Sequence, residues 1–366
     1  MQYMWPRKGT NNAMRHGISL LPDCRPDRRS AVEYYRDALA LTRFADQAGL
    51  DYVKMTEHYI GEYGGYCPSP LTFLSTVAAQ TERIRLMTGA VLPAFHHPIQ
   101  IAAHAAMVDA ISEGRLDLGF GRAWLPYEFE AFGVPMDESR ARYEATIKAV
   151  LRLWTEEKVT EDTPFFAFTD ATSLPRVVQN PHPPVWGAAV RSPESFTWLG
   201  EHGFGVMLAL APLKQDVGLS KYVIDLYRNA FTAKHGADRE LPGIALSTPL
   251  YVAETDEEAY RVAEPLYREY MSVWSEAASS WETTKSGSYV GYDSMGKHAK
   301  NLRDFDVRKH GTAVIGSPET VVERIHEFRE EYGVDTLLWQ VDFGGQNLDQ
   351  MMSSLKLYVE KVIPNL

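Results

Sequence analysis

Cysteine is scarce in this sequence, with only Cys24 and Cys67 among 366 residues. Two thiols in so long a chain cannot form the dense disulfide framework that stabilises small secreted proteins. Long apolar runs are also missing, because no stretch approaches the roughly 20 residues that a membrane-spanning helix needs. The first twenty residues contain no apolar signal core before a small-residue cleavage site. We therefore expect a cytoplasmic protein without a membrane anchor.

Positive charge is in deficit, with 37 Lys and Arg against 48 Asp and Glu and a formal net charge of -11. An acidic surface repels both the phosphate backbone of nucleic acids and anionic lipid headgroups, so we expect neither as a partner. Apolar residues make up 45% of the chain. That composition and length are sufficient for a large core, and a single barrel can occupy the whole chain.

Short apolar strands alternate with amphipathic helices along the chain. The pattern predicts eight strands, at 16–21, 52–56, 84–92, 116–120, 185–189, 205–210, 244–253 and 336–341. Helices are predicted at 33–48, 98–111, 138–154, 215–234, 319–330 and 348–362, with two more starting at 192 and 256. Eight alternations favour a parallel sheet that closes into a (β/α)8 TIM barrel of the α/β class. We expect residues 1–366 to form this single domain.

One segment, from 272 to 311, interrupts the rhythm between the seventh and eighth strands. It is polar and rich in Ser, Gly, Lys and Asp. Connections of this length are uncommon in compact domains and often serve as active-site lids. The sequence therefore predicts a long insertion that acts as a mobile lid.

Catalytic residues of (β/α)8 barrels collect at the carboxyl ends of the strands. At these positions the sequence places Glu57, His58, His96, His97, Arg122, Trp124, Arg191, Ser192 and Asp342. Aromatic residues near the same ends could wall a dry pocket for a flat ring system. These aromatic residues are Tyr59, Tyr63, Tyr66, Phe95, Trp124, Tyr127 and Phe129.

Arg122 ends the stretch GRLDLGFGR, in which glycines clear space around the backbone. If Arg122 faces the helix that starts at Ser192, its guanidinium and the hydroxyls of Ser192 and Ser195 could hold a phosphate together with free backbone N–H groups. The alternative is a surface arginine paired with Glu128 or Glu130.

His58 is a candidate acid, base or hydrogen-bond donor, since the imidazole titrates near neutral pH. The alternative is a structural histidine that bonds Glu57 or a backbone carbonyl. A metal site is a third option, because Glu57, His58, His96, His97 and Asp342 follow neighbouring strands. However, no H-x-H or H-E-x-x-H spacing supports it, and we predict no metal.

Several strings together resemble the bacterial luciferase-like, flavin-dependent monooxygenases, and the insertion makes the chain most similar to their luciferase α-type chains. The resemblance covers nearly the whole chain and rests on Thr56-Glu57-His58, on SEGRLDLGFG (112–121) with Arg122, on Phe132-Gly133 with MDESR (136–140), on Gly291-Tyr292-Asp293 with Arg303-Asp304-Phe305, and on Gly316-Ser317-Pro318-Glu319. It implies a barrel that binds reduced FMN at the strand ends. It also implies that O2 forms a flavin C4a-peroxide, which oxygenates an organic substrate.

The resemblance also assigns roles by position. His58 matches the catalytic histidine, and Arg122, Ser192 and Ser195 match the residues that hold the FMN phosphate. Phe73, Leu74 and Ser75 align with a bend of the third strand beneath the isoalloxazine, and Asp342 matches an acidic residue after the last strand. Three residues depart from the family: Arg191 replaces a glutamate beside the phosphate, Tyr59 replaces a second histidine, and Trp124 is bulkier than its counterpart. We expect Arg191 and Trp124 among the cofactor-binding residues.

The predicted function is therefore a two-component, FMN-dependent monooxygenase that acts on a small apolar substrate. A separate flavin reductase would supply the reduced FMN, because the chain has no G-x-G-x-x-G dinucleotide motif of its own. By analogy with the family we expect a homodimer. The alternatives are a deazaflavin-dependent oxidoreductase, a non-catalytic flavin-binding partner subunit and a metal-dependent barrel hydrolase.

Overall fold

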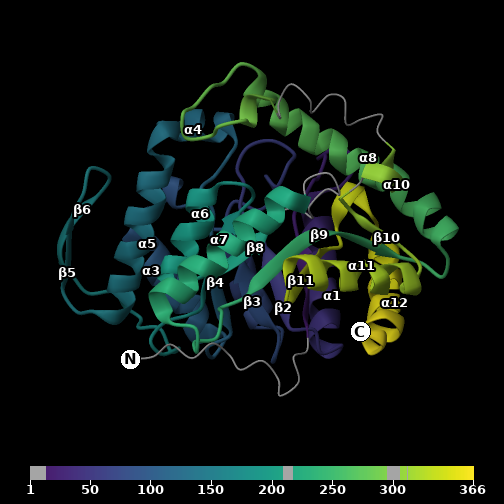
Figure 1. Ribbon diagram of the computed structural model, residues 1–366, viewed down its shortest axis with the longest axis horizontal. Helices are drawn as coiled ribbons and strands as arrows, with labels where there is room; N and C mark the ends of the chain where they lie inside the picture. Colours follow the sequence, from purple (N-terminus) through teal and green to yellow (C-terminus); the bar gives the residue numbers. More distant parts are fainter. Residues whose placement is uncertain (1–13, 209–216, 295–305, 311) are drawn as a thin grey trace.

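Eight parallel strands close into a barrel in the computed structural model, which describes residues 14–208, 217–294, 306–310 and 312–366. Neighbouring strands follow the order β1-β2-β3-β4-β7-β8-β9-β11, and β11 pairs with β1 to close the ring (Figure 1). The prediction of a (β/α)8 barrel is confirmed. The strands are β1 Arg15–Leu20, β2 Tyr52–Met55, β3 Arg85–Thr88, β4 Leu116–Phe120, β7 Val185–Ala189, β8 Gly205–Leu208, β9 Ile244–Val252 and β11 Thr336–Gln340.

The third strand is shorter than predicted. The apolar pattern suggested a strand over 84–92, but β3 ends at Thr88. The next peptide, between Gly89 and Ala90, is cis, and only Val91 returns to pair with Phe120 of β4. The sequence pattern does not reveal the end of β3, because residues on both sides of the bend are buried and mostly apolar.

Helices surround the barrel, and polar side chains start most of them. Ser30 and Glu33 form a capping box at the start of α1, and Ser192, Ser317 and Asn347 cap the helices that follow them. The helices are α1 Ala31–Gln47, α2 Pro70–Ala78, α3 Pro98–Ile111, α4 Pro126–Phe132, α5 Ser139–Thr155, α6 Pro193–His202, α7 Val217–His235, α8 Asp256–Ala278, α10 Val307–His310, α11 Pro318–Tyr332 and α12 Leu348–Leu357.

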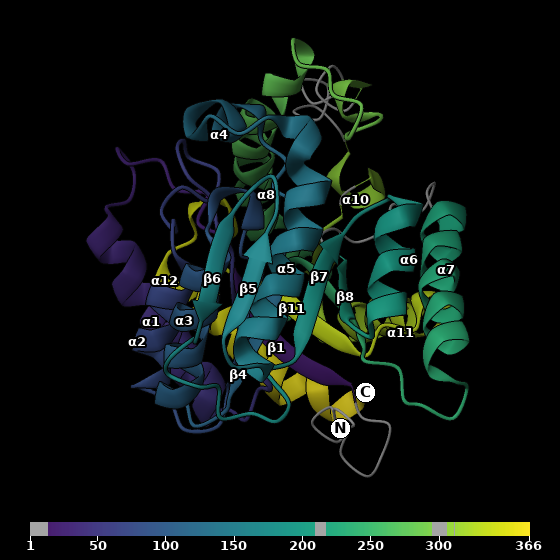
Figure 2. The same ribbon diagram turned by 90° about the vertical axis from the view of Figure 1, so that its left-hand side faces the viewer.

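Six of the described helices and strands were not predicted from the sequence, namely α2, α10 and four others. The strands β5 (Val159–Asp162) and β6 (Ala167–Ala171) form an antiparallel hairpin that lies along the outer side of α5 (Figure 2). The strand β10 (Val314–Gly316) pairs with the end of β9, and the last of the four is the short helix α4. These elements are brief or half-exposed, so they lack a long hydrophobic period.

The predicted insertion lies between β9 and β11, as expected, but it does not begin as a loop. Its first residues, 272–278, are the last two turns of α8, and a 3-10 turn (Ser279–Glu282) follows. Residues 295–305 and 311 of the predicted lid lie outside the described residues. Figure 1 shows α8 and the segment after it crossing the same end of the barrel as α4.

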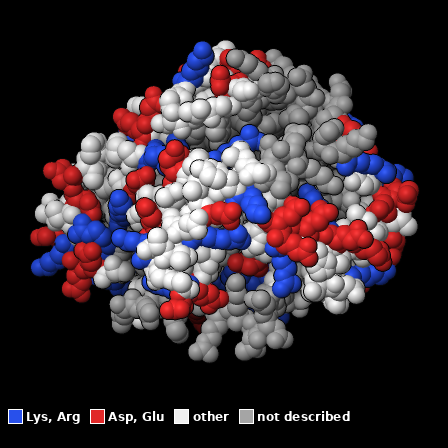
Figure 3. Space-filling model, viewed as in Figure 1, with Lys and Arg blue, Asp and Glu red and all other residues white. Residues whose placement is uncertain are grey.

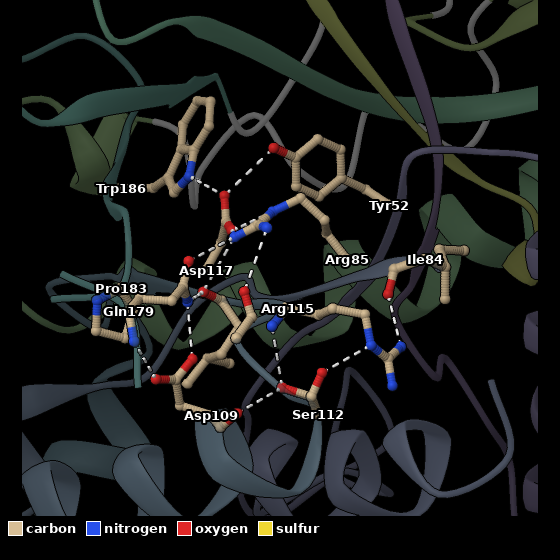
Figure 4. A network of polar contacts seen from close by, with 12 residues as sticks. Tyr52, Ile84, Arg85, Asp109, Ser112, Arg115, Asp117, Gln179, Pro183 and Trp186 are labelled. Atoms are coloured by element: carbon tan, nitrogen blue, oxygen red, sulfur yellow. Dashed lines mark hydrogen bonds and ion pairs between the residues drawn. The ribbon is translucent and has the colours of Figure 1, made fainter. Parts of the chain in front are cut away.

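The opposite, amino-terminal end of the barrel is filled by a buried polar network. Asp117 of β4 accepts hydrogen bonds from Trp186 Nε1 at 2.9 Å, Arg85 Nε at 2.7 Å and the Tyr52 hydroxyl at 3.3 Å (Figure 4). Asp109 at the end of α3 accepts from the amide of Gln179 at 2.7 Å. These contacts fix the barrel floor and leave the carboxyl end for function.

The remaining features agree with the composition. Cys24 and Cys67 are both free thiols and both buried. No helix in the described part of the chain is long and apolar enough to cross a bilayer. Acidic and basic side chains are mixed over the face shown in Figure 3.

Candidate active site

A cluster of arginines surrounds the start of α6. Ser192 is the N-cap of this helix, and its hydroxyl accepts a hydrogen bond from the Ser195 backbone N–H. Arg140 of α5 donates to the hydroxyls of Ser192 and Ser195, at 3.0 and 3.3 Å. The arrangement unites a helix N-terminus, two hydroxyls and a guanidinium, which are the groups that bind a phosphate.

Arg122 lies beside this cluster, at the end of β4. Its guanidinium donates to the Ser139 hydroxyl and the Ser288 carbonyl, both at 3.0 Å, and lies over the ring of Tyr289 at 4.7 Å. Burial and then the positive charge of Arg122 lower the pKa of Arg140. Arg122 therefore lies near Arg140, which contacts the start of α6, and the described residues show no pairing of Arg122 with Glu128 or Glu130.

One carboxylate and one orphan donor complete the cluster. The Ser192 hydroxyl donates to Glu194 at 2.7 Å, and this hydrogen bond, with the nearby arginines, lowers the pKa of Glu194. The Nε of Arg122 is buried and has no hydrogen-bond partner among the described residues. A buried guanidinium nitrogen without a partner is costly, so the cluster fits a ligand that brings an anionic acceptor, such as the phosphate of FMN.

Arg140 is the site residue that the sequence prediction missed. It lies in the string MDESR that carries part of the family resemblance, but no strand end precedes it. Arg191 is exposed, as its position before the helix N-cap requires, and its charge acts on Tyr292 together with that of Arg122. Arg191 thus belongs to the same positive region.

His58 follows β2 and is buried, with 6% of its surface exposed. Its Nδ1 lies 3.2 Å from Oε1 of Glu128, which is fully buried and also accepts from the Tyr59 backbone N–H at 2.7 Å. The alternative in which His58 bonds Glu57 is wrong. An ionised Glu128 places the proton on Nδ1 and leaves Nε2 as the free acceptor. The ring of Tyr63 lies 5.2 Å from the imidazole.

The other polar residues considered for a metal have separate roles. Glu57 pairs with His96 at 2.6 Å, and His97 caps α3 by accepting from the Ile99 N–H. Both oxygens of Asp342 accept from the Leu21 N–H. No group of three His, Cys, Asp or Glu side chains with metal-binding geometry occurs within the described ranges.

Asp342 ties the barrel rim to α1. Besides the contact with Leu21, it accepts a hydrogen bond from the Tyr34 hydroxyl at 2.9 Å. Burial raises the pKa of Asp342 to about 6. Asp23 lies close to it, and burial together with the charge of Asp342 raises the pKa of Asp23 well above its usual range. The predicted contact of Asp342 with flavin stays a prediction.

The predicted position of Phe73, Leu74 and Ser75 is wrong. These residues lie in α2, where Phe73 and Leu74 face the core outside the barrel, and not at a bend of the third strand. The bend is at Gly89-Ala90. Both segments are apolar runs after buried strands, so matching by residue type alone could not separate them.

Small residues occupy the strand ends next to this bend. A Cβ atom placed on Gly121 would lie 3.1 Å from Cβ of Ala90 and 3.9 Å from Cβ of Ala188. Ala90 and Gly121 follow β3 and β4, Ala188 lies on β7, and all three present little more than backbone to the barrel mouth. A surface without side-chain bulk suits a flat ring.

Aromatic side chains border this mouth on the side of α8. The ring of Trp124 contacts Tyr63 edge-on at 5.9 Å and stacks against Trp274 at 6.3 Å. The Trp281 indole donates to the Trp124 carbonyl at 2.9 Å, and the Tyr289 hydroxyl donates to the Ala123 carbonyl at 2.8 Å. The described part of the insertion is therefore docked on the loop after β4, while its predicted mobility stays a prediction.

Comparison with known proteins agrees with this geometry. The sequence profile of the family described as luciferase-like monooxygenase matches residues 14–336, and the chain belongs to that family. The expectation of a monooxygenase of this family is confirmed. The oxygenase component of the flavin-dependent trigonelline monooxygenase of Acinetobacter baylyi is 27% identical over 352 residues, covering 92% of this chain and 91% of that protein.

Solved structures place the chain in the same group. The monooxygenase RslO1 from Streptomyces bottropensis superposes with a TM-score of 0.83 at 36% identity, covering 96% of this chain and 99% of that one. The oxygenating constituent of 3,6-diketocamphane monooxygenase from Pseudomonas putida, in complex with FMN, gives 0.77 at 20% identity, covering 97% and 99%. A coenzyme F420-dependent reductase from Methanopyrus kandleri gives 0.68 at 20% identity, covering 96% and 99%. The last two likenesses show the fold alone.

Proposed function

We propose that this chain is the oxygenase component of a two-component system, which binds reduced FMN and uses O2 to oxygenate a small apolar substrate. The observation that carries the proposal is the cluster of Arg122, Arg140, Ser192 and Ser195 around the start of α6. Membership of the family and the likeness to a trigonelline monooxygenase oxygenase component support it. A separate reductase would supply the reduced flavin.

The residues of this chain would bind, orient and shield the cofactor. Bound reduced FMN would supply the electrons that activate O2. Arg122 and Arg140 would neutralise the phosphate, the Ser195 hydroxyl would donate to it, and the Ser192 hydroxyl would do so after turning away from Glu194. Phosphate binding would also give the orphan Nε of Arg122 an acceptor.

His58 would act on protons near the reacting atoms. Its Nδ1 is held by Glu128, so its Nε2 is the nitrogen that can accept or return a proton. The docked segment around Trp281 and Tyr289 would exclude water from the mouth, since both side chains are buried against the loop after β4. Exclusion of water prevents wasteful side reactions of activated oxygen.

The experiment compares FMN with riboflavin, which lacks the phosphate. We expect Arg122→Ala and Arg140→Ala each to weaken FMN binding by about tenfold or more, because a charge-assisted hydrogen bond is lost, and to leave riboflavin binding nearly unchanged. Binding is measured by anaerobic titration of the reduced flavins. Arg152→Ala is the matched control, because Arg152 lies on the same helix α5 but pairs with the exposed Glu156.

The binding results distinguish the proposed function from its alternatives. Equal losses for FMN and riboflavin would remove the phosphate assignment. Tight binding of coenzyme F420 without binding of FMN would replace the proposal by the deazaflavin alternative. Binding of reduced FMN without substrate turnover or any transient absorbance on rapid mixing with O2 would favour a non-catalytic partner subunit. The predicted homodimer is tested separately by the mass in solution.

A further inference from the structure

Lys54 lies on β2, four residues before His58, and its side chain faces the inside of the barrel. Side chains along β2 alternate, so Tyr52 and Lys54 face the axis while Val53 and Met55 face the surrounding helices. Only 8% of the Lys54 surface is exposed. Its aliphatic stem lies against Gly89, where a Cβ atom would come within 2.5 Å of Lys54 Cγ. Lys54 thus lies directly under the bend that ends β3.

No hydrogen bond or ion pair of the Lys54 ammonium is found among the described residues. Burial lowers the pKa of Lys54 to about 8, and the charge of Asp342 only partly opposes this effect. A largely buried lysine without a counter-charge is destabilising, and a fold tolerates one where a ligand supplies that charge. The structural alternative, a buried salt bridge to Lys54, is not found among the residues that the structure describes.

A second polar group without a partner lies at the same level. Lys54 is in register with Ser19 of β1, and Ser19 is in register with Gln340 of β11. Gln340 is 4% exposed, alternates with the inward-facing Leu338, and its Nε2 has no hydrogen-bond partner among the described residues. The Ser19 hydroxyl accepts a hydrogen bond from the Ser247 hydroxyl of β9 at 3.2 Å. A buried amide N–H of Gln340 and the Lys54 ammonium thus lie at one level of the barrel, and neither has an acceptor among the described residues.

We infer that Lys54 and Gln340 form an oxyanion subsite at the base of the barrel mouth, which binds the negatively charged, oxygen-bearing edge of a conjugated ring. The inference rests on the proposed function, because it assigns this edge to a ligand of the same mouth. Such an edge has two sources: the pyrimidine ring of reduced flavin, or a phenolate or enolate oxygen of the substrate. Both have delocalised negative charge that an ammonium and an amide N–H would stabilise.

The test uses Lys54→Met, which keeps the length of the side chain and removes its charge. We expect it to weaken anaerobic binding of reduced FMN by about tenfold with little effect on oxidised FMN if the flavin edge is the ligand. If the substrate is the source, reduced FMN binding is unchanged, and binding of 4-nitrophenolate, followed by its absorbance, falls about tenfold while binding of neutral nitrobenzene does not. Gln340→Leu is expected to weaken binding of the same ligand by a smaller factor than Lys54→Met does.

Controls separate the possible failures. Lys361→Met makes the same change at a surface lysine paired with Glu254, and we expect no effect on either probe. The melting temperature of Lys54→Met should equal or exceed that of the wild type, because an unpaired buried charge is removed. If the wild type fails to bind reduced FMN, the proposed function fails, whereas the substrate arm still tests the subsite. If Lys54→Met binds both probes as the wild type does, the subsite is refuted.

Discussion

At the scale of single residues, the chemistry of this mouth depends on pairs that the sequence does not reveal. His58 was predicted as a catalytic residue because of its type and position, but its partner Glu128 lies 70 positions away along the chain. In the proposed reaction, the hydrogen bond between them would select Nε2 as the nitrogen that acts on protons. Glu128 is therefore a positioning residue, and its Oε2 has no partner among the described residues.

We predict that Glu128→Gln lowers kcat by about tenfold or more and changes KM by less than about twofold, because orientation of His58 is lost while the binding surfaces remain. Steady-state oxygenation with a reductase present measures both constants. Glu128→Asp should restore part of kcat. A purely structural role would instead raise KM, lower the melting temperature and show no rescue. Glu130→Gln, two residues away on the exposed side of α4, serves as the control.

Asp342 gives a pH dependence of stability. Its pKa is raised to about 6 in the folded protein by burial, above the value of about 3.9 in an unfolded chain. The folded state therefore binds a proton more tightly than the unfolded state, and this carboxyl stabilises the fold as the pH falls from 7.5 to 5. We expect the wild type to gain about 1 kcal/mol relative to Asp342→Asn over this interval.

Urea unfolding at the two pH values measures the difference between wild type and variant. Asp349→Asn, at an exposed position of α12, should show no such change relative to the wild type. A constant difference between wild type and Asp342→Asn at both pH values would contradict the assignment.

At the scale of elements, the docked part of the insertion contacts Arg122, one of the arginines of the proposed phosphate site. Arg122 donates to the Ser288 carbonyl, and the Tyr289 hydroxyl donates back to the carbonyls of Arg122 and Ala123. The same arginine would thus contact the phosphate and the segment that covers the mouth. Length and polarity indicated an insertion here, but they could not show which described residues anchor it.

We predict that Tyr289→Phe increases the hydrogen peroxide released per reduced FMN consumed by about twofold or more. The substitution removes the single hydroxyl donor shared by the carbonyls of Arg122 and Ala123, which holds the docked segment, so water reaches the mouth more often. Peroxide is quantified in the reaction with substrate present. Tyr222→Phe, on the exposed face of α7, is the control and should not change the yield. An unchanged yield for Tyr289→Phe would show that this contact does not seal the site.

At the scale of the whole molecule, the sequence predicted the barrel because its eight main strands are buried and separated by long amphipathic helices. It could not predict the β5–β6 hairpin, whose residues are half-exposed, or the bend at Gly89, where apolar residues continue through a change of direction. Strand ends located Arg122, Ser192 and His58. Arg140 projects from a helix, and only the packing of α5 against α6 places it beside the serines.

The two ends of the barrel differ in what their polar groups contact. At the floor, the carboxylate of Asp117 is saturated with donors, whereas at the mouth Arg122, Lys54 and Gln340 retain unused hydrogen-bonding capacity within the described chain. Mutations at the mouth consequently cost the scaffold little, while mutations at the floor threaten it. Related barrels can therefore change substrate by substitutions at a few positions of the mouth, while the polar network at the amino-terminal end stays the same.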